Sequence, residues 1–164
     1  MGHIRQAEPA DAEQLLQIYS PVVKNTCTSF ELTPPTENEF ALRIATSIES
    51  HEWLVMEEAE RLIGYAYATP HRSREAYKYS VETSIYIHND YSRKGVGKKL
   101  YKALFVSLQS RNFHNAYAGI TLPNEASVAL HKSLGFEAIG IFREIGFKHN
   151  EWHDVSWWQR KIGD

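Results

Sequence analysis

The sequence contains a single cysteine, Cys27, and no long run of apolar residues. One cysteine excludes an internal disulfide and any zinc site built from several cysteines. No uncharged apolar stretch approaches the ~20 residues that a membrane-spanning helix needs, and the first residues lack the apolar segment of a secretory signal. Because a lone thiol also suits a reducing compartment, we expect a cytoplasmic protein without a membrane partner.

An excess of charge of one sign is also missing. Eighteen Lys and Arg residues are matched by twenty Asp and Glu residues, which gives a formal net charge of −2 at pH 7. A broad positive field is typical of nucleic-acid binders, so we expect no nucleic-acid partner. The chain has 164 residues, 43% of them hydrophobic, which suits one domain with its own core. The sequence therefore predicts a single domain over residues 1–164.

Hydrophobic periodicity predicts alternating strands and helices. Helix-capping patterns at Asp11 and Thr36 precede apolar residues at helical spacing, and the same spacing predicts helices over 95–111 and 124–134. Alternating or continuous apolar runs predict strands over 3–7, 53–57, 62–69, 81–87, 116–122, 136–147 and 152–161. This order of elements predicts an α/β fold of the α+β type, with a mixed sheet and helices on both faces.

The segment Ser92-Arg-Lys-Gly-Val-Gly97 joins a predicted strand to the longest predicted helix. A helix N-terminus offers free N–H groups and the positive end of the helix dipole, and glycine allows a ligand to approach the backbone. Arg93, Lys94 and Lys98 add positive charge there. The pattern favours a diphosphate site, although two glycines also make a plain tight turn. Neither the Walker pattern nor the dinucleotide pattern matches, since Leu100 replaces the third glycine.

This segment resembles the [QR]-x-x-G-x-[GA] motif of the GNAT superfamily of N-acetyltransferases, with Ser92 in place of Gln or Arg. Residues 124–136 resemble the second GNAT motif, N-x-x-[SA]-x-x-x-[YH]-x-x-x-G-F. Segments 74–77, 81–86 and 146–155 are most similar to phosphinothricin and methionine sulfoximine N-acetyltransferases. The resemblance implies a GNAT-like fold, with a mostly antiparallel twisted sheet and one parallel strand pair around the cofactor. It also implies acetyl-CoA as co-substrate, no metal, and a homodimer.

The implied reaction moves an acetyl group from acetyl-CoA to a primary amine. An amine with a pKa near ~10 is protonated at neutral pH, so the reaction needs a base. Glu82 matches the catalytic glutamate of the family and shares a strand face with Ser84 and Tyr86. It would act directly or through a water, although an exposed strand glutamate needs no such role. His131 stands where the family has Tyr or His, which leaves an acid, a second base or a packed side chain open.

The resemblance also implies which residues hold the cofactor. The strand after Glu82 should offer backbone groups to the pantetheine arm, and the glycine segment should hold the diphosphate. Asn124 is also a typical helix N-cap, and both roles can coexist. The expected cofactor-binding residues are Ile85, Tyr86, Ile87, Arg93, Lys94, Gly95, Val96, Gly97, Lys98, Asn124 and Ser127.

The acceptor is expected to be a small amino-acid-like amine, such as phosphinothricin, methionine sulfoximine, methionine sulfone or an ordinary amino acid. The cationic segment 71–78 precedes the Glu82 strand, and Arg can bind a carboxylate with two hydrogen bonds. The expected acceptor-binding residues are Phe30, Arg72, Arg74, Tyr77 and Lys78. Acetylation of a protein N-terminus or lysine, and a non-catalytic CoA-binding sensor, are the alternatives.

His149 and His153 lie four residues apart, as in some metal sites. They fall in a predicted hairpin, and the H-E-x-x-H order is missing because Glu151 stands at the third position. We therefore expect no metal at this pair.

Overall fold

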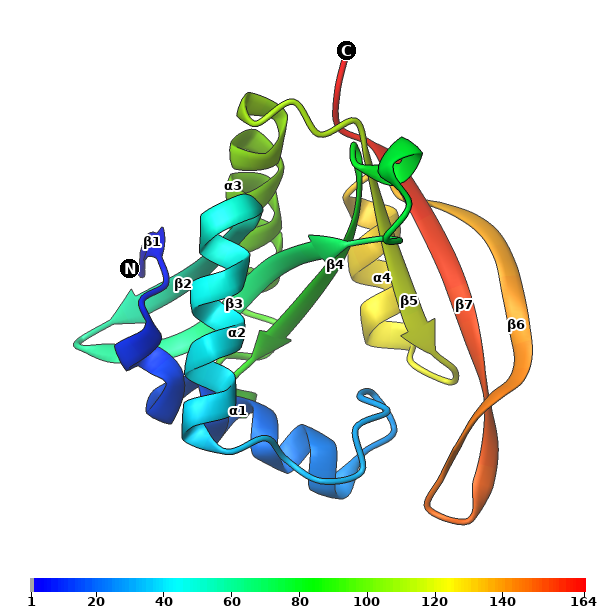
Figure 1. The fold of residues 1–164 in the computed structure, drawn as a ribbon. Coiled ribbons are helices and arrows are strands. Elements are labelled where there is room, and N and C mark those ends of the chain that lie inside the picture. Colours follow the sequence, from blue (N-terminus) through cyan, green and yellow to red (C-terminus); the bar gives the residue numbers. More distant parts are fainter. Residues whose placement is uncertain (1) are drawn as a thin grey trace.

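The computed structural model describes residues 2–164 and contains a seven-stranded sheet covered by helices (Figure 1). The order across the sheet is β1-β2-β3-β4-β5-β7-β6, and every neighbouring pair is antiparallel except β4–β5. The predicted mixed sheet is confirmed. The strands are β1 (His3–Gln6), β2 (Glu52–Glu58), β3 (Arg61–Pro70), β4 (Ser80–Ile87), β5 (Asn115–Thr121), β6 (Glu137–Lys148) and β7 (Glu151–Lys161).

Four α-helices lie where the sequence patterns predict them: α1 (Ala12–Asn25), α2 (Glu37–Ser50), α3 (Val96–Ser110) and α4 (Glu125–Ser133). The capping box of α2 is confirmed, because Thr36 Oγ1 accepts from the Glu39 N–H and the Glu39 carboxylate accepts from the Thr36 N–H. The expected side-chain cap by Asp11 is wrong. Its carboxylate instead binds the guanidinium of Arg5 at 2.8 and 2.9 Å.

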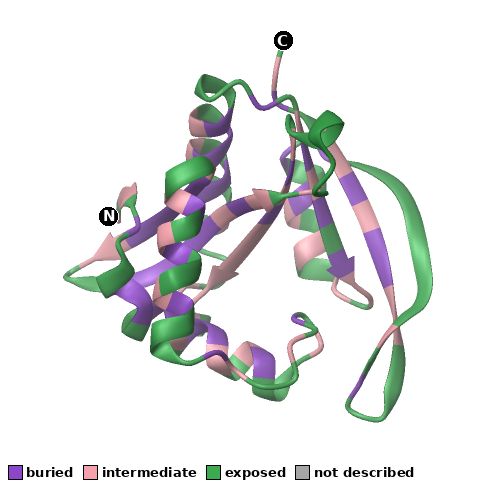
Figure 2. Cartoon of the chain, in the orientation of Figure 1, coloured by how far each residue is buried: buried purple, intermediate pink, exposed green. Residues whose placement is uncertain are grey.

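The helices bury opposite faces of the sheet. Side chains alternate along a strand, so Trp53 and Val55 of β2 pack with α1 and α2, whereas Leu54 and Met56 pack with α3. Figure 2 shows the buried residues along the centre of the sheet. The predicted arrangement of helices on both faces is confirmed. No helix within residues 2–164 is long and apolar enough to cross a membrane.

The sheet splits between β4 and β5. These strands pair only from Ser80 to Glu82, and beyond that point β4 stays with β3 while β5 stays with β7. Figure 1 shows the two strands diverging from a common end. The His88 N–H donates to the Ile63 carbonyl at 2.9 Å, so the antiparallel register directs the even-numbered peptide groups of β4 to β3. The peptide groups of residues 83, 85 and 87 therefore face the split.

Candidate active site

A cavity of about 280 Å³ lies beside Glu82, where β4 begins to leave β5. Part of the lining comes from the loop after α1, and part comes from β6 and β7. Most of the lining is apolar or hydroxylic, and Glu82 is its one charged side chain within residues 2–164. The lining residues are Thr28, Phe30, Glu82, Thr83, Ser84, Gly119, Thr121, Phe142, Ile145, Val155 and Trp157.

Glu82 is held by His71, a residue that no sequence motif marks. The Nδ1 atom of His71 lies 3.2 Å from Glu82 Oε1, and the His71 ring stacks on Tyr117 at 5.0 Å. About a third of the Glu82 side chain is exposed, so a ligand in the cavity can reach the carboxylate. The register of the β3–β4 hairpin, with Pro70 opposite Val81, brings His71 to this place. Only the pairing register of β3 and β4 identifies His71 as a neighbour of Glu82.

A second, narrow cavity of about 50 Å³ occupies the split itself. It is bounded by β4 and β5 on its sides and by α3 and α4 behind. Its lining shares Thr28, Thr83, Ser84, Gly119 and Thr121 with the first cavity, so the two spaces adjoin. A ligand lying in the split would therefore reach the space in front of Glu82.

The glycine segment forms the N-terminus of α3, as predicted. Gly95 has φ of +78° and Arg93 has φ of +62°, and these left-handed residues turn the chain into the helix. Arg93, Lys94 and Lys98 are all exposed there, so the structure brings the predicted cations to one helix end. Gly97 lies against α4, because a Cβ added to it would be 3.2 Å from Leu130.

Two expected cofactor residues are placed differently from the rest. Val96 is buried in the core, so only its backbone faces the helix end. Tyr86 lines the narrow cavity, but its peptide groups point to β3 and its ring packs edge-on against Tyr19, with 5.0 Å between the ring centroids. Ile85 and Ile87 have peptide groups that face the split, as expected for the pantetheine arm.

His131 borders the narrow cavity and is only 3% exposed. Its Nδ1 atom lies 2.7 Å from the Ser127 carbonyl, so this nitrogen carries the proton. Its Nε2 atom lies 3.0 Å from the hydroxyl of the fully buried Tyr101, which donates to it. Burial lowers the pKa of His131 and outweighs the opposing hydrogen bond to Ser127. The imidazole is therefore a neutral acceptor at neutral pH, which favours a base or an orienting role over an acid.

Asn124 and Ser127 also line the narrow cavity. The Asn124 side-chain oxygen accepts from the Ser127 N–H at 3.1 Å, which confirms the predicted N-cap of α4. The cap leaves the Ser127 hydroxyl beside the split, where it lies 3.4 Å from His131 Nδ1. Both residues are thus positioned by the start of this helix.

The expected acceptor residues are only partly brought together. Phe30 lines the cavity beside Glu82. The rings of Tyr77 and His71 pack edge-to-face, with 5.7 Å between their centroids. Arg72, Arg74 and Lys78 are exposed on the segment between β3 and β4 and lie outside the lining of that cavity.

The two histidines of the C-terminal hairpin serve separate contacts. His149 Nδ1 lies 3.7 Å from Cys27 Sγ, and His153 Nε2 lies 2.9 Å from the Lys148 carbonyl. Within the described part of the chain, no three His, Cys, Asp or Glu side chains are grouped to hold a metal.

The structure thus places the Glu82 carboxylate beside a cavity that adjoins the β4–β5 split, and it places three exposed cations at the N-terminus of α3. The acetyltransferase (GNAT) domain family matches residues 4–157, and the chain belongs to this family. It is an N-acetyltransferase similar to the phosphinothricin N-acetyltransferases.

Three similar proteins illustrate the relationship. The chain is 36% identical over 157 residues to phosphinothricin N-acetyltransferase of Streptomyces viridochromogenes, which covers 96% of this chain and 86% of that protein. It is 33% identical over 162 residues to the L-methionine sulfoximine/L-methionine sulfone acetyltransferase of Salmonella typhimurium, covering 98% and 95%. The crystal structure of a phosphinothricin acetyltransferase from Sinorhizobium meliloti in complex with acetyl-CoA superimposes with a TM-score of 0.94. That match has 38% identity and covers 99% of this chain and 89% of the other.

Proposed function

We propose that this protein transfers the acetyl group of acetyl-CoA to the primary amine of a small amino-acid-like acceptor, with Glu82 as general base. The observation that carries the proposal is the place of Glu82. It is the one charged side chain, within residues 2–164, that lines the cavity adjoining the β4–β5 split. The names of the relatives support phosphinothricin, methionine sulfoximine or methionine sulfone as acceptors. Mass spectrometry of the product of each acceptor would locate the acetyl group on its amine.

The residues of the split fit acetyl-CoA. The peptide groups of residues 83, 85 and 87 face a space that β5 does not fill, and amide groups of a pantetheine arm could pair with them. The N-terminus of α3 carries exposed Arg93, Lys94 and Lys98, which suits a diphosphate. When bound, acetyl-CoA supplies an activated acetyl thioester at the end of the split next to Glu82.

Glu82 performs the proton chemistry in this account. It accepts a proton from the acceptor ammonium, directly or through a water, so that the amine becomes nucleophilic. His71 fixes the carboxylate through the contact at 3.2 Å. The amine nitrogen then bonds to the acetyl carbon, the carbon–sulfur bond breaks, and CoA leaves as a thiolate that takes up the second proton lost by the nitrogen. An N–H of β4 that faces the split would stabilise the negative charge that develops on the carbonyl oxygen. His131, as a neutral acceptor, orients the Tyr101 hydroxyl behind the split or takes up a proton there.

Arg74→Ala tests whether the exposed cationic segment binds the acceptor. The guanidinium is expected to form a bidentate contact with an acceptor carboxylate, so the KM for methionine sulfone should rise about fivefold. The KM for acetyl-CoA should stay unchanged. Steady-state thiol release measures both constants, with Lys102→Ala as the control because Lys102 is an exposed cation on α3. An unchanged acceptor KM would place carboxylate binding elsewhere.

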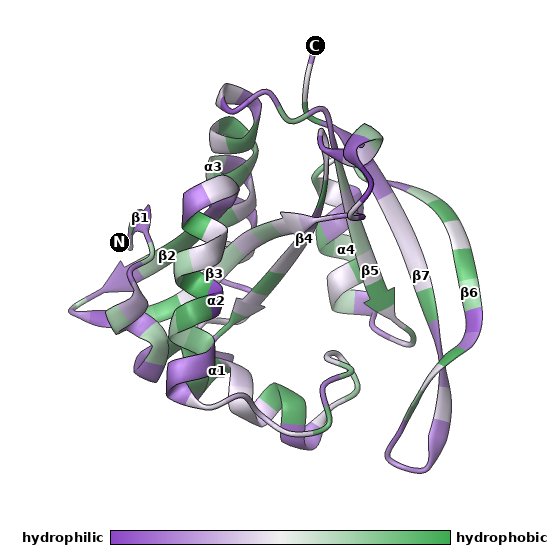
Figure 3. Ribbon diagram, in the orientation of Figure 1, coloured by the Kyte–Doolittle hydropathy of each residue, from purple (hydrophilic) through white to green (hydrophobic). Residues whose placement is uncertain are grey.

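We also propose that the enzyme is a homodimer that pairs through β6. This strand ends the sheet, and Figures 2 and 3 show that it is exposed and largely hydrophobic. Exposed apolar strands of this kind mark contact surfaces. Its exposed large apolar side chains are Ile139, Ile141, Phe142, Ile145 and Phe147. Phe142 and Ile145 also line the Glu82 cavity, so a second copy would border the acceptor site.

Ile141→Glu is expected to convert the dimer to a monomer, because a buried unpaired carboxylate at the contact is costly. Light scattering after gel filtration measures the mass. Leu42→Glu is the control, since Leu42 is also an apolar, exposed side chain but lies on α2. A wild-type monomer, or a variant that remains dimeric, would contradict pairing through β6.

A further inference from the structure

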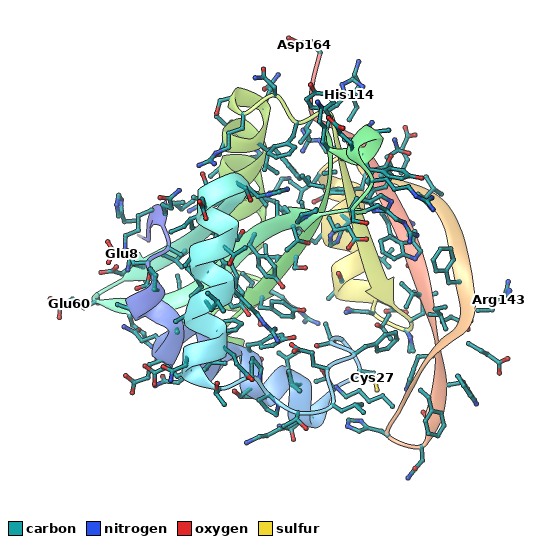
Figure 4. The ribbon with its side chains drawn as sticks, viewed as in Figure 1. Glu8, Cys27, Glu60, His114, Arg143 and Asp164 are labelled. Carbon is teal, nitrogen blue, oxygen red and sulfur yellow. The ribbon has the colours of Figure 1, made fainter. Side chains whose placement is uncertain are left out.

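The loop between α1 and α2 forms one side of the Glu82 cavity and is anchored from a distant part of the chain. Thr28 and Phe30 of this loop line the cavity together with Phe142 and Ile145 of β6. In Figure 1 the loop lies next to the end of the β6–β7 hairpin, and Figure 4 shows Cys27 on the loop, facing it. The two segments therefore touch each other and also supply part of the lining of the same cavity.

Lys148, the last residue of β6, links the hairpin both to the last turn of α1 and to the loop that follows it. Its Nζ atom donates to the Val23 carbonyl at 2.7 Å and to the Ser29 carbonyl at 2.7 Å. The residue is only 3% exposed, and no carboxylate of residues 2–164 lies within 4.0 Å of Nζ. A buried ammonium on two carbonyls is expensive unless those bonds are kept, so the contact strongly favours one loop position.

Other contacts hold the same loop in the position that Lys148 favours. The Phe30 ring packs so closely on Gly146 that a Cβ there would overlap it. At the other side of the loop, the Tyr19 hydroxyl lies 2.8 Å from Ser29 Oγ. Ser29 thus has its carbonyl bound by Lys148 and its hydroxyl bound by Tyr19. Thr28 and Phe30, which reach the cavity, are the two neighbours of this fixed residue.

We propose that Lys148 is a positioning residue for the acceptor: it fixes Ser29, and through Ser29 it sets the positions of Thr28 and Phe30 in the acceptor cavity. The proposal rests on the proposed acetyltransferase function for the identity of the ligand. The ammonium does not line the cavity and takes no part in the chemistry. Its removal should therefore weaken acceptor binding. Of the residues that line the split it displaces only Thr28, where the two cavities meet, so the β4 peptide groups and the N-terminus of α3 stay in place.

Lys148→Met keeps the length of the side chain but removes the donors. We expect the KM for methionine sulfone to rise by about tenfold or more, since two charge-assisted hydrogen bonds are lost. The KM for acetyl-CoA should change by less than about twofold, because its expected contacts lie on β4 and α3. Lys161→Met, at an exposed lysine of β7, should leave both constants unchanged. A purely structural role would instead reduce activity with no preference for the acceptor.

Tyr19→Phe keeps the proposal testable if Lys148→Met folds poorly. It removes the hydroxyl that binds Ser29 Oγ and should raise the acceptor KM in the same selective way, to a smaller extent. Hydrogen exchange of the amides of residues 26–31 in the full chain should accelerate in both variants. This readout remains valid if wild-type protein acetylates no amine, a result that would overturn the proposed function alone. Unchanged exchange in this segment, or an equal rise of both KM values, would overturn the role of Lys148.

Discussion

Glu82→Gln should lower kcat at pH 7 by about 10²- to 10⁴-fold, the usual contribution of a positioned general base. The amide has nearly the same shape as the carboxylate but cannot accept the proton of the acceptor ammonium. The expected contacts of acetyl-CoA involve β4 peptide groups and the start of α3, so the Kd for acetyl-CoA should remain within about twofold. Steady-state thiol release gives kcat, and calorimetric titration gives the Kd.

The matched control is Glu49→Gln, which makes the same change at an exposed position of α2. It should behave as wild type. If turnover by the Glu82 variant rises at alkaline pH, where the free amine becomes abundant, the base assignment gains direct support. Equal turnover by the Glu82 variant and wild type at pH 7 would remove Glu82 as the base.

Gly97→Trp should abolish measurable binding of acetyl-CoA, with a loss of at least ~100-fold in affinity, equivalent to about 2.7 kcal/mol. A Cβ at this position already lies 3.2 Å from Leu130 and 3.5 Å from Ile85. An indole therefore has to project into the space between the first turn of α3, α4 and β4, where the proposed diphosphate and pantetheine arm lie. Calorimetric titration with acetyl-CoA measures the effect.

The control for this substitution is Val106→Trp, which places the same ring on an exposed position of the same helix. Circular dichroism and thermal melting of both variants show whether each keeps its fold. A folded Gly97→Trp protein that binds acetyl-CoA as tightly as wild type would refute the placement of the cofactor.

The spacing of apolar and capping residues along the chain was sufficient to predict the helices, the strands and the mixed sheet. The helix capped by Thr36 follows from a capping box that the chain satisfies within four residues. The side chain of Asp11 does not cap α1 because its carboxylate accepts from the Glu8 N–H of the preceding turn and from the guanidinium of Arg5. A capping pattern therefore fails where neighbouring groups occupy the carboxylate.

The site was predictable where a motif lies within one continuous segment. The glycine turn and the cations before α3 follow from residues 92–98, and the cap of α4 follows from Asn124. His71 and Lys148 could not be found this way. His71 reaches Glu82 through the register of a hairpin, and Lys148 reaches Ser29 across 119 positions of sequence. Periodicity also does not tell which strand peptide groups stay unpaired, as the orientation of Tyr86 shows.

The most direct test of the account is thiol release from acetyl-CoA by the wild-type protein across a panel of amines. The panel contains phosphinothricin, methionine sulfoximine, methionine sulfone, the common amino acids, a polyamine and a short peptide. The account predicts turnover with at least one small amino acid or analogue and little with the polyamine or the peptide. Turnover with the peptide alone would favour a protein acceptor. If no amine of the panel causes thiol release although the protein binds acetyl-CoA, the result would contradict the proposed acetyltransferase function and favour a CoA-binding sensor.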